Sequence, residues 1–156
     1  MRTTSVAHRV LRSVVMVCLV ACAESPTEQR QDDLATARAR WRTGGLTGYD
    51  FELQRLCYCP DETVRPVTVS VRGSAFAGLA HTDDGTAADT VWFRDFLTME
   101  RVFEYLERTV AERPAVFMAT YDAVLGYPVS VELDGDRQVA DDELWLEIPA
   151  LRPVTP

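Results

Sequence analysis

One alternating pattern occurs twice in this 156-residue chain and limits its fold more than any other feature. The segment Pro-Val-Thr-Val-Ser-Val-Arg-Gly at residues 66–73 aligns with Pro-Val-Ser-Val-Glu-Leu-Asp-Gly at residues 128–135, an offset of 62 residues. Apolar residues at every second position predict half-buried strands, because successive side chains of a strand point to opposite faces. Each copy follows a helical pattern and another strand, so the repeat indicates two similar units. Chance alternation in two unrelated strands is the alternative.

Two segments have the apolar spacing of one helix face. Leu34, Ala37 and Trp41 fall at i, i+3 and i+7, which predicts a helix with Trp41 as its core anchor. A second helix is predicted to begin near Thr98, whose hydroxyl can cap the first turn, and to end at Pro114.

The remaining periodic segments predict strands. Residues 81–89 are acidic, contain a glycine and predict a loop. We therefore expect an α+β fold with an antiparallel sheet of about six strands and two helices on its inner face, built as two helix-plus-three-strand units. The expected strands cover residues 49–57, 66–73, 74–80, 115–121, 127–135 and 143–148.

The N-terminal segment has the order of regions typical of a lipoprotein signal peptide. Three arginines accompany an apolar stretch over residues 14–20, and the chain then reads Leu-Val-Ala-Cys up to Cys22. This order resembles the lipobox, where a signal peptidase cuts before a lipidated cysteine. The apolar stretch is far shorter than the ~20 residues that cross a bilayer, which argues against a membrane span. An ordinary secretory signal is the other alternative.

These features predict a lipid-anchored domain. We expect residues 1–21 to be removed as the signal peptide, residues 22–33 to form a tether, and residues 34–150 to form a single domain. Several acyl chains on Cys22 would anchor the domain stably to a membrane. The predicted location is the extracytoplasmic side of the cell envelope. In a Gram-negative cell it is the outer membrane, because Ala23 rather than an aspartate follows Cys22.

The composition excludes several classes of function. All 16 basic residues are arginine, so Walker-type phosphate loops, Schiff-base enzymes and lysine general bases are ruled out. Without the signal peptide, His81 is the only histidine, which rules out zinc sites with several histidines from one chain. The mature part has 13 arginines and 24 acidic residues, a net charge of −11. Such a surface repels nucleic acid, so we expect no nucleic-acid partner.

Cys57 and Cys59 are the thiols that remain once the signal is removed and Cys22 is lipidated. An even pair in an oxidising compartment is typical of a disulfide. In a flat strand residues i and i+2 stand about 6.6 Å apart, while bonded cysteines need Cβ atoms near 3.8 Å, so the chain must bend there. The alternatives are a redox-active pair, a Cu(I) site completed by Met99 or Met118, and two thiols without function.

Two further groups of residues are candidates for binding. Tyr58, Trp92 and the segment 126–128 could lie on a recognition surface, although such residues also serve as turn and core elements. An acidic segment suggests calcium, but Trp145 occupies the position where an EF-hand loop needs a glutamate, and a solvated hairpin is the alternative. The acidic residues are Asp134, Asp136, Asp141, Asp142 and Glu143.

Several motifs together resemble a bacterial lipoprotein family, the domain of unknown function family 6174, over about residues 34–148. The resemblance implies localisation and fold, and it supplies no catalytic residue because no activity is established for the family. The motifs are the lipobox, the helix ending in Trp41, Tyr49-Asp50-Phe51-Glu52-Leu53 leading into Cys57-Tyr58-Cys59-Pro60, the Pro-Val-Thr-Val strand, Thr98-Met99-Glu100, Tyr121-Asp122 with Gly126-Tyr127-Pro128, and Asp141-Asp142-Glu143.

We therefore expect a lipid-anchored envelope lipoprotein that acts as a binding or accessory module rather than as an enzyme. Its expected partners are the membrane, through the lipid on Cys22, and an envelope protein; no cofactor, metal or catalytic residue is predicted. The rival hypothesis is an envelope thiol-redox or copper-handling protein that uses Cys57 and Cys59. A hydrolase with paired carboxylates is a third class, and it predicts two acids that face each other in a cleft.

Overall fold

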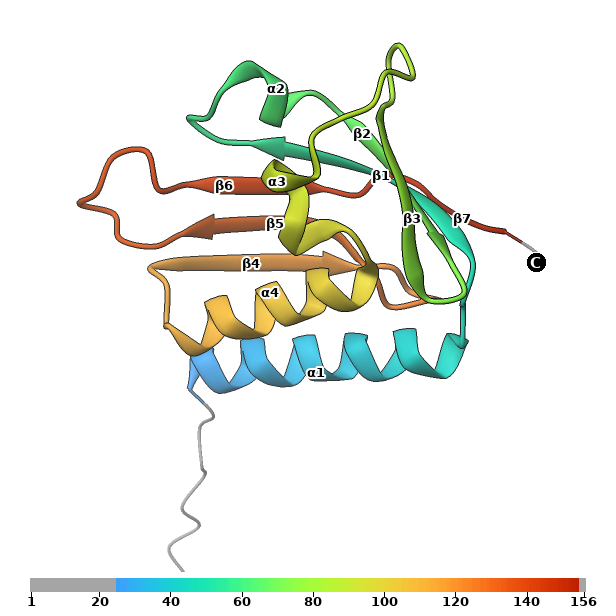
Figure 1. Cartoon of the computed structure of the whole chain (residues 1–156). Helices are drawn as coiled ribbons and strands as arrows, with labels where there is room; N and C mark the ends of the chain where they lie inside the picture. The colour runs from blue at the N-terminus through green and yellow to red at the C-terminus, as the bar shows by residue number, and fades with distance from the viewer. Residues whose placement is uncertain (1–24, 155–156) are drawn as a thin grey trace, which may run out of the picture.

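Residues 25–154 are described by a computed structural model, in which helices pack on a seven-stranded antiparallel sheet (Figure 1). The predicted α+β class and antiparallel sheet are confirmed. Strands β1–β3 stay together in the sheet, strands β4–β6 stay together, and the two groups meet where β1 pairs with β6. The sheet order is β3 (Ala75–His81), β2 (Val67–Arg72), β1 (Tyr49–Leu56), β6 (Leu144–Glu147), β5 (Pro128–Asp134) and β4 (Val116–Tyr121).

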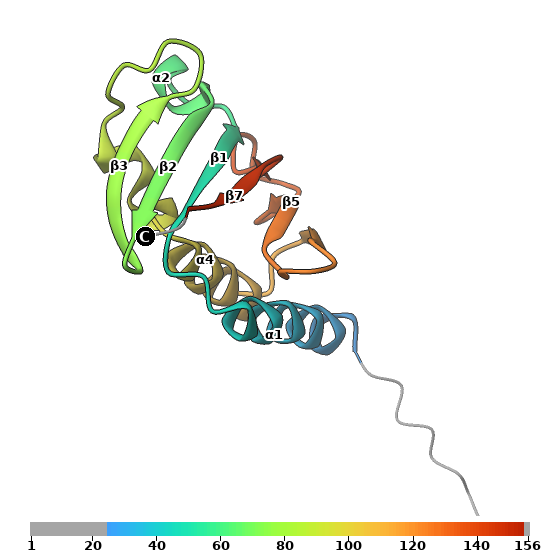
Figure 2. The same cartoon turned by 90° about the vertical axis from the view of Figure 1, so that its right-hand side faces the viewer.

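A seventh strand was not expected from the sequence. Strand β7 (Leu151–Pro153) pairs with the first half of β1, while β6 pairs with the last part of β1 along the same edge. Pro149 lies between the two strands, and the chain stays joined to β1 there because Glu52 N donates to Ala150 O at 3.0 Å. Figure 2 shows β7 running beside β1. Three residues that end in a proline carry too little alternation to predict a strand.

Helix α1 (Pro26–Gly44) begins earlier than predicted. Its N-terminus is a capping box, in which Ser25 Oγ accepts from Glu28 N at 3.3 Å and Glu28 Oε2 accepts from Ser25 N at 2.8 Å. Residues 26–33 of the predicted tether over residues 22–33 are helical, and residues 22–24 lie outside the described part. The first turns of α1 face mainly solvent, so apolar spacing could not mark them.

Helix α4 (Met99–Ala111) forms as predicted, with Thr98 as its cap. Thr98 Oγ1 accepts from Arg101 N at 3.2 Å, and Leu97 and Val102 are both buried, as expected of a hydrophobic staple. The buried stripe of α4 packs on the inner face of the sheet, whose central positions are also buried. The stripe is Val102, Phe103, Leu106 and Val110, and the β1 and β2 positions are Tyr49, Phe51, Leu53, Val67, Val69 and Val71.

Three short helical segments were missed: α2 (Asp61–Val64), α3 (Thr90–Phe93) and the 3-10 turn η1 (Arg94–Phe96). Each has four residues or fewer, which is about one helical turn, so none repeats its apolar spacing. Over residues 25–154, every helix is too short or too polar to cross a bilayer.

A buried polar network joins α1, β1 and α4. The hydroxyl of Tyr49 accepts from Met99 N at 3.0 Å and donates to Glu100 Oε2 at 3.2 Å, while Trp41 Nε1 donates to Glu100 Oε1 at 3.0 Å. The rings of Trp41 and Tyr49 meet edge to face with centroids 5.1 Å apart. Burial, and then the carboxylate of Glu100, raise the pKa of Tyr49 well above its ordinary value.

The turn between β4 and β5 packs tightly against α1. Gly126 has a φ of +82°, and a Cβ added there would lie 2.4 Å from Ala37 O. Asp122 Oδ1 accepts from Val124 N at 2.9 Å and from Leu125 N at 2.6 Å, which holds the turn in shape. This position therefore requires glycine for two separate reasons.

Candidate functional site

The outer face of the sheet, opposite α4, carries a line of exposed apolar side chains. In the register of the sheet Met118 of β4 pairs with Glu132 of β5, Glu132 pairs with Trp145 of β6, and Trp145 pairs with Leu56 of β1. Residues directly opposite in an antiparallel sheet share one face, so these four form a continuous row, here called the outer row. Met118 is 57% exposed, Leu56 43% and Trp145 39%.

The disulfide loop follows directly after Leu56. The sulfurs of Cys57 and Cys59 are bonded, and their Cα atoms lie 5.2 Å apart, closer than the about 6.6 Å of a flat strand. The chain bends as expected, because β1 ends at Leu56 and Cys59 N donates to Cys57 O at 2.9 Å, a γ-turn. Tyr58 at the centre of this turn is 83% exposed. The loop therefore presents an aromatic ring at the end of the outer row.

The structure does not bring the candidate copper ligands together. Met99 is fully buried and lies against Tyr49, at the opposite end of β1 from the cysteines. Met118 lies on β4, and β5 and β6 separate that strand from β1. Among residues 25–154, no group of three or more histidine, cysteine or acidic side chains is placed to hold a metal ion.

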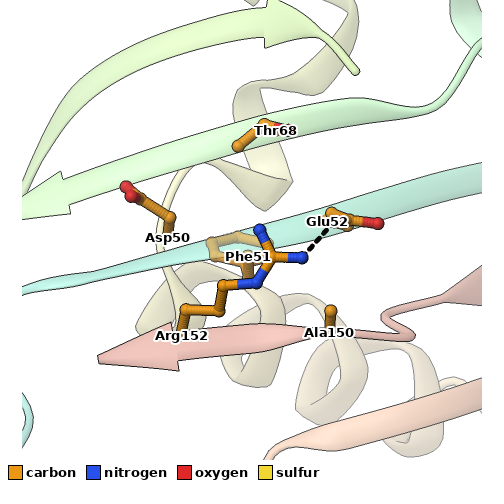
Figure 3. Close-up of a pocket in the computed structure, with 6 residues that line it drawn as sticks. All are labelled: Asp50, Phe51, Glu52, Thr68, Ala150 and Arg152. Carbon is orange, nitrogen blue, oxygen red and sulfur yellow. Dashed lines mark hydrogen bonds and ion pairs between the residues drawn. The ribbon is translucent and has the colours of Figure 1, made fainter. Parts of the chain in front are cut away.

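Two carboxylates on the β1 part of the outer face are matched by arginines. Arg72 contacts both oxygens of Asp50, at 2.8 and 3.2 Å, and these hydrogen bonds hold the pKa of Asp50 below its usual value. Arg152 of β7 donates to Glu52 at 3.2 Å (Figure 3). The hollow beside this pair is only about 10 Å³, room for one water molecule. This half of the outer face is thus charge-balanced, and a larger hollow of about 280 Å³ lies beside Glu52 and Gln54.

The carboxylates on β5 and β6 are different. Within the described residues, Glu132, Asp134 and Glu147 form no ion pair with an arginine. Glu147 accepts only from Ser130 Oγ, at 2.9 Å. Partial burial and the nearby carboxylates of Asp142 and Glu143 raise the pKa of Asp134. This half of the face, which contains most of the outer row, is acidic and unbalanced.

The acidic hairpin lies beside a hollow that is lined by two carboxylates, and one of them is hydrogen-bonded to the loop backbone. A hollow of about 420 Å³ near the end of α4 is lined by Glu112 and Asp142. Asp142 Oδ2, however, accepts from Asp136 N at 2.9 Å, and Asp136 Oδ1 accepts from Gln138 N at 3.0 Å. These side chains organise the loop between β5 and β6, as the solvated-hairpin alternative predicts.

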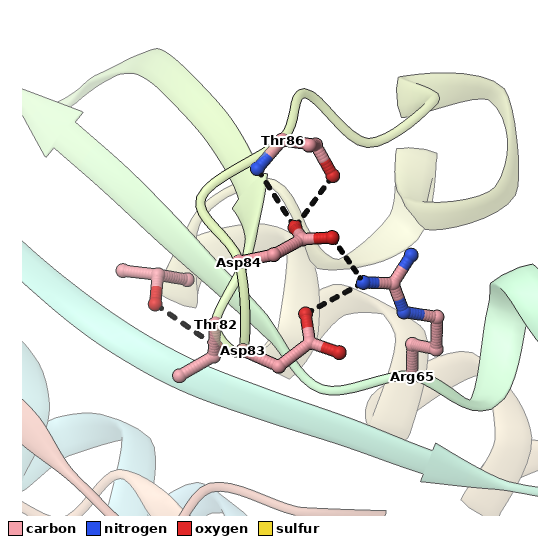
Figure 4. A network of polar contacts seen from close by, with 6 residues as sticks. Arg65, Thr82, Asp83, Asp84 and Thr86 are labelled. Carbon is pink, nitrogen blue, oxygen red and sulfur yellow. Dashed lines mark hydrogen bonds and ion pairs between the residues drawn. The ribbon is translucent and has the colours of Figure 1, made fainter.

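The loop after β3 is held by a polar network (Figure 4). Arg65 donates to Asp83 at 2.6 Å and to Asp84 at 2.9 Å, and Thr86 donates to Asp84 through its amide at 2.9 Å and its hydroxyl at 2.6 Å. The Thr86 hydroxyl and amide and then Arg65 lower the pKa of Asp84 to about 2. Thr68 and Thr82 add a hydroxyl contact at 3.0 Å. The network explains the ordered shape of the predicted loop.

The structure separates the residues that were predicted as recognition candidates. Gly126, Tyr127 and Pro128 are buried turn and core elements, as the alternative interpretation held, while Tyr58 is exposed. Trp92 is 45% exposed on α3, and its carbonyl accepts from Arg55 Nη1 at 2.6 Å.

Arg55 and His81 lie on the inner face. Arg55 extends over the rings of Phe93 and Phe96 at 5.8 and 5.4 Å, and burial lowers its pKa. His81 is 7% exposed and pairs with Val67.

Sequence reasoning did not predict that Leu56, Met118 and Trp145 are exposed together on one face of the sheet. The signal was present, because each is an apolar residue at a position where the alternation of its strand calls for a polar one. Met118 follows buried Phe117, and Trp145 precedes buried Leu146. Their alignment into one row depends on the register of four strands, which no single segment reveals.

A family model, described as a family of unknown function (DUF6174), matches residues 33–153. No curated protein and no solved structure gives a significant match.

Proposed function

The chain belongs to this family of unknown function, and on that premise we propose that it is a lipid-anchored binding module of the cell envelope, which docks a protein on its outer row and Tyr58. The observation that carries the proposal is the exposure of Met118, Trp145 and Leu56 in register across the sheet.

Exposed apolar side chains are informative when they are contiguous. Single ones are normal on any surface, but contiguous patches mark interaction sites, because covering them releases water from apolar surface. Tryptophan, tyrosine and methionine are enriched at protein interfaces, and tryptophan and tyrosine carry a large share of the binding energy. The outer row and Tyr58 supply all three residue types at one end of the sheet.

The disulfide supports this function locally. A three-residue ring removes little chain entropy from the unfolded state, so the bond contributes less to global stability than a long-range disulfide would. It does fix the backbone on both sides of Tyr58. We infer that its role is to hold the Tyr58 ring ready for contact, which lowers the entropy lost on binding.

Anchoring would come from a lipid on Cys22, which places the domain on the extracytoplasmic side, at the outer membrane in a Gram-negative host. Support for this part comes from the order of residues around Cys22 alone. Mass spectrometry of the protein from its native host is expected to show a chain that begins at an acylated Cys22. A chain that retains Met1, or an unmodified Cys22, contradicts the anchoring.

Photo-crosslinking in the native host tests the docking surface. The full chain would carry p-benzoylphenylalanine in place of Met118 in the outer row, or in place of Val124 as the control, since Val124 is 79% exposed on the turn near α1. We expect one discrete adduct from position 118 and none of that mass from position 124. Adding Trp145→Ala should lower the yield of that adduct by roughly tenfold, as for an interface hot spot. Equal adducts from positions 118 and 124 would contradict docking on this face. So would a yield of the position-118 adduct that Trp145→Ala does not change.

The alternative function, in redox chemistry or copper handling, uses the same disulfide loop. A second measurement, on the Cys57–Cys59 bond, distinguishes it from docking. Titration of the full chain should find the Cys57–Cys59 bond inert at mild reducing potential, and the Cys57→Ser, Cys59→Ser variant should retain docking with weaker affinity. Fast reversible reduction would favour the redox function, and stoichiometric Cu(I) uptake by the reduced pair would favour metal handling.

A further inference from the structure

The charges around the outer row show what kind of partner it fits. On the same sheet face Asp50 and Glu52 are each matched by an arginine of this chain. Glu132, Asp134 and Glu147 have no such match among residues 25–154. The unmatched carboxylates therefore coincide with the part of the face that also exposes Met118 and Trp145.

Any protein that docks on the outer row also covers Glu132. Glu132 sits within the outer row, between Met118 on one side and Trp145 on the other. Any protein that covers these two apolar side chains also removes water from the carboxylate between them. Burying a carboxylate without a partner charge is more unfavourable than the apolar contact beside it is favourable.

Glu147 and Asp134 are two further carboxylates on this face that have no arginine partner in the described chain. Glu147 pairs in register with Ser130 and Gln54, and none of the three carries a positive charge. Asp134 pairs with Val116, and its Oδ1 is buried with no hydrogen-bond donor in the described chain. A complementary surface must bring donors to these positions.

We infer, resting on the function proposed above, that the outer row binds a cationic polypeptide segment that presents arginine or lysine side chains and apolar side chains on the same face. Its apolar side chains contact Trp145, Leu56 and Met118, while its cationic side chains pair with Glu132 and Glu147. An arginine that forms two parallel hydrogen bonds with a carboxylate fits this arrangement well.

Other cationic or apolar ligands fit less well. Nucleic acids and anionic lipid surfaces are repelled by the net charge of −8. A small polyamine could pair with the carboxylates but would leave Trp145, Leu56 and Met118 exposed. A second copy of this chain would place carboxylates against carboxylates. A polypeptide segment supplies both kinds of contact in one chain.

Three matched peptides test the inference. Each has twelve residues in which pairs of apolar residues, valine or leucine, alternate with pairs of variable residues, so that an extended chain presents both kinds on each face. The six variable positions are all lysine, all glutamine or all glutamate. The protein is the full chain with 5-fluorotryptophan, in nanodiscs of zwitterionic lipid, and 19F NMR reports on each tryptophan. Trp145 is the reporter, Trp41 is a buried internal control at 3% exposure, and Trp92 reports non-specific binding elsewhere.

We expect the lysine peptide to shift the Trp145 resonance without shifting Trp41 or Trp92, and to bind more weakly as salt rises. Glu132→Gln should weaken this binding by about fivefold to tenfold. Glu52→Gln is the matched control, because Glu52 lies on the same face but is already paired with Arg152, and it should change the affinity by less than about twofold.

Each remaining outcome overturns the inference in a distinguishable way. If the glutamine peptide binds Trp145 as well as the lysine peptide does, the surface recognises apolar groups only, and docking on the outer row stands without the charge requirement. If no peptide shifts Trp145, or if Trp92 responds instead, cationic recognition by this row is wrong. Docking itself is then judged by the position-118 adduct alone, which does not depend on any of these peptides.

Discussion

Single residues control how the two long helices are joined to the sheet, and Tyr49 is the clearest case. Its hydroxyl satisfies Met99 N and also reaches Glu100, which in turn holds Trp41. Tyr49→Phe should lower the free energy of unfolding by about 1 to 3 kcal/mol, because the buried amide of Met99 loses its acceptor and Glu100 loses one of its two donors. Urea unfolding measures this. Tyr127→Phe is the control: its hydroxyl forms no hydrogen bond in the part of the chain that the structure describes, so its loss should be small.

Asp84 gives a second prediction for a single residue. The Thr86 hydroxyl is the largest of the contacts that hold the pKa of Asp84 at about 2, so Thr86→Val should raise that pKa toward the ordinary 3.8. Because the pKa is depressed in the folded state, the stabilisation is complete above the unfolded value and is lost as pH falls through about 2. Carboxyl 13C NMR titration would report both values. An unchanged midpoint in the variant would show that Arg65 dominates instead.

Among the helices and strands, the sequence predicted those whose apolar spacing repeats. Six strands and both long helices were found because each contains several periods of alternation or of helical spacing. The capping residue Thr98 was found because its neighbours on both sides are apolar. By contrast, α2, α3, η1 and β7 each contain fewer than two periods, whereas β6 has four residues but two periods of strand alternation.

The candidate site was harder to predict than the fold. Tyr58 and the Cys57–Cys59 pair were singled out because they are adjacent in sequence. The outer row is a property of register across β4, β5, β6 and β1, whose members are up to 89 residues apart in the chain, from Leu56 to Trp145. Local patterns indicate which face a side chain takes, but they do not reveal which strands lie side by side.

The turn between β4 and β5 makes an element-scale prediction. Gly126→Ala should lower the free energy of unfolding by about 3 kcal/mol or more, because a left-handed φ and a clash with Ala37 O add together. Gly85→Ala is the matched control, since Gly85 also has a positive φ, +72°, but nothing lies within 4 Å of the added Cβ. It should cost about 1 to 2 kcal/mol. Equal losses in urea unfolding would mean that the turn can move away from α1.

For the whole molecule, the tyrosines predict how stability depends on alkaline pH. Burial raises the pKa of four of the five tyrosines, Tyr49, Tyr105, Tyr121 and Tyr127. A raised folded pKa means that the stabilisation is complete below the unfolded value near 10 and is lost as pH rises through the folded values. The free energy of unfolding should therefore fall steeply above about pH 10. Urea unfolding between neutral and strongly alkaline pH tests this, and Tyr49→Phe should make the fall shallower; a flat profile would contradict the burial of these hydroxyls.

The early start of α1 has a consequence for where the molecule can work. Between Cys22 and the first helical residue, Pro26, the backbone can extend at most about 14 Å. Under the proposed acylation, this short linker would keep the domain next to the lipid headgroups, so the domain would not sample a wide volume above them. The distance of each part of the domain from the bilayer would be set by the folded domain itself and not by a long flexible linker. A ligand, whether dissolved or embedded in the membrane, would therefore have to meet a domain that is held close to the bilayer surface.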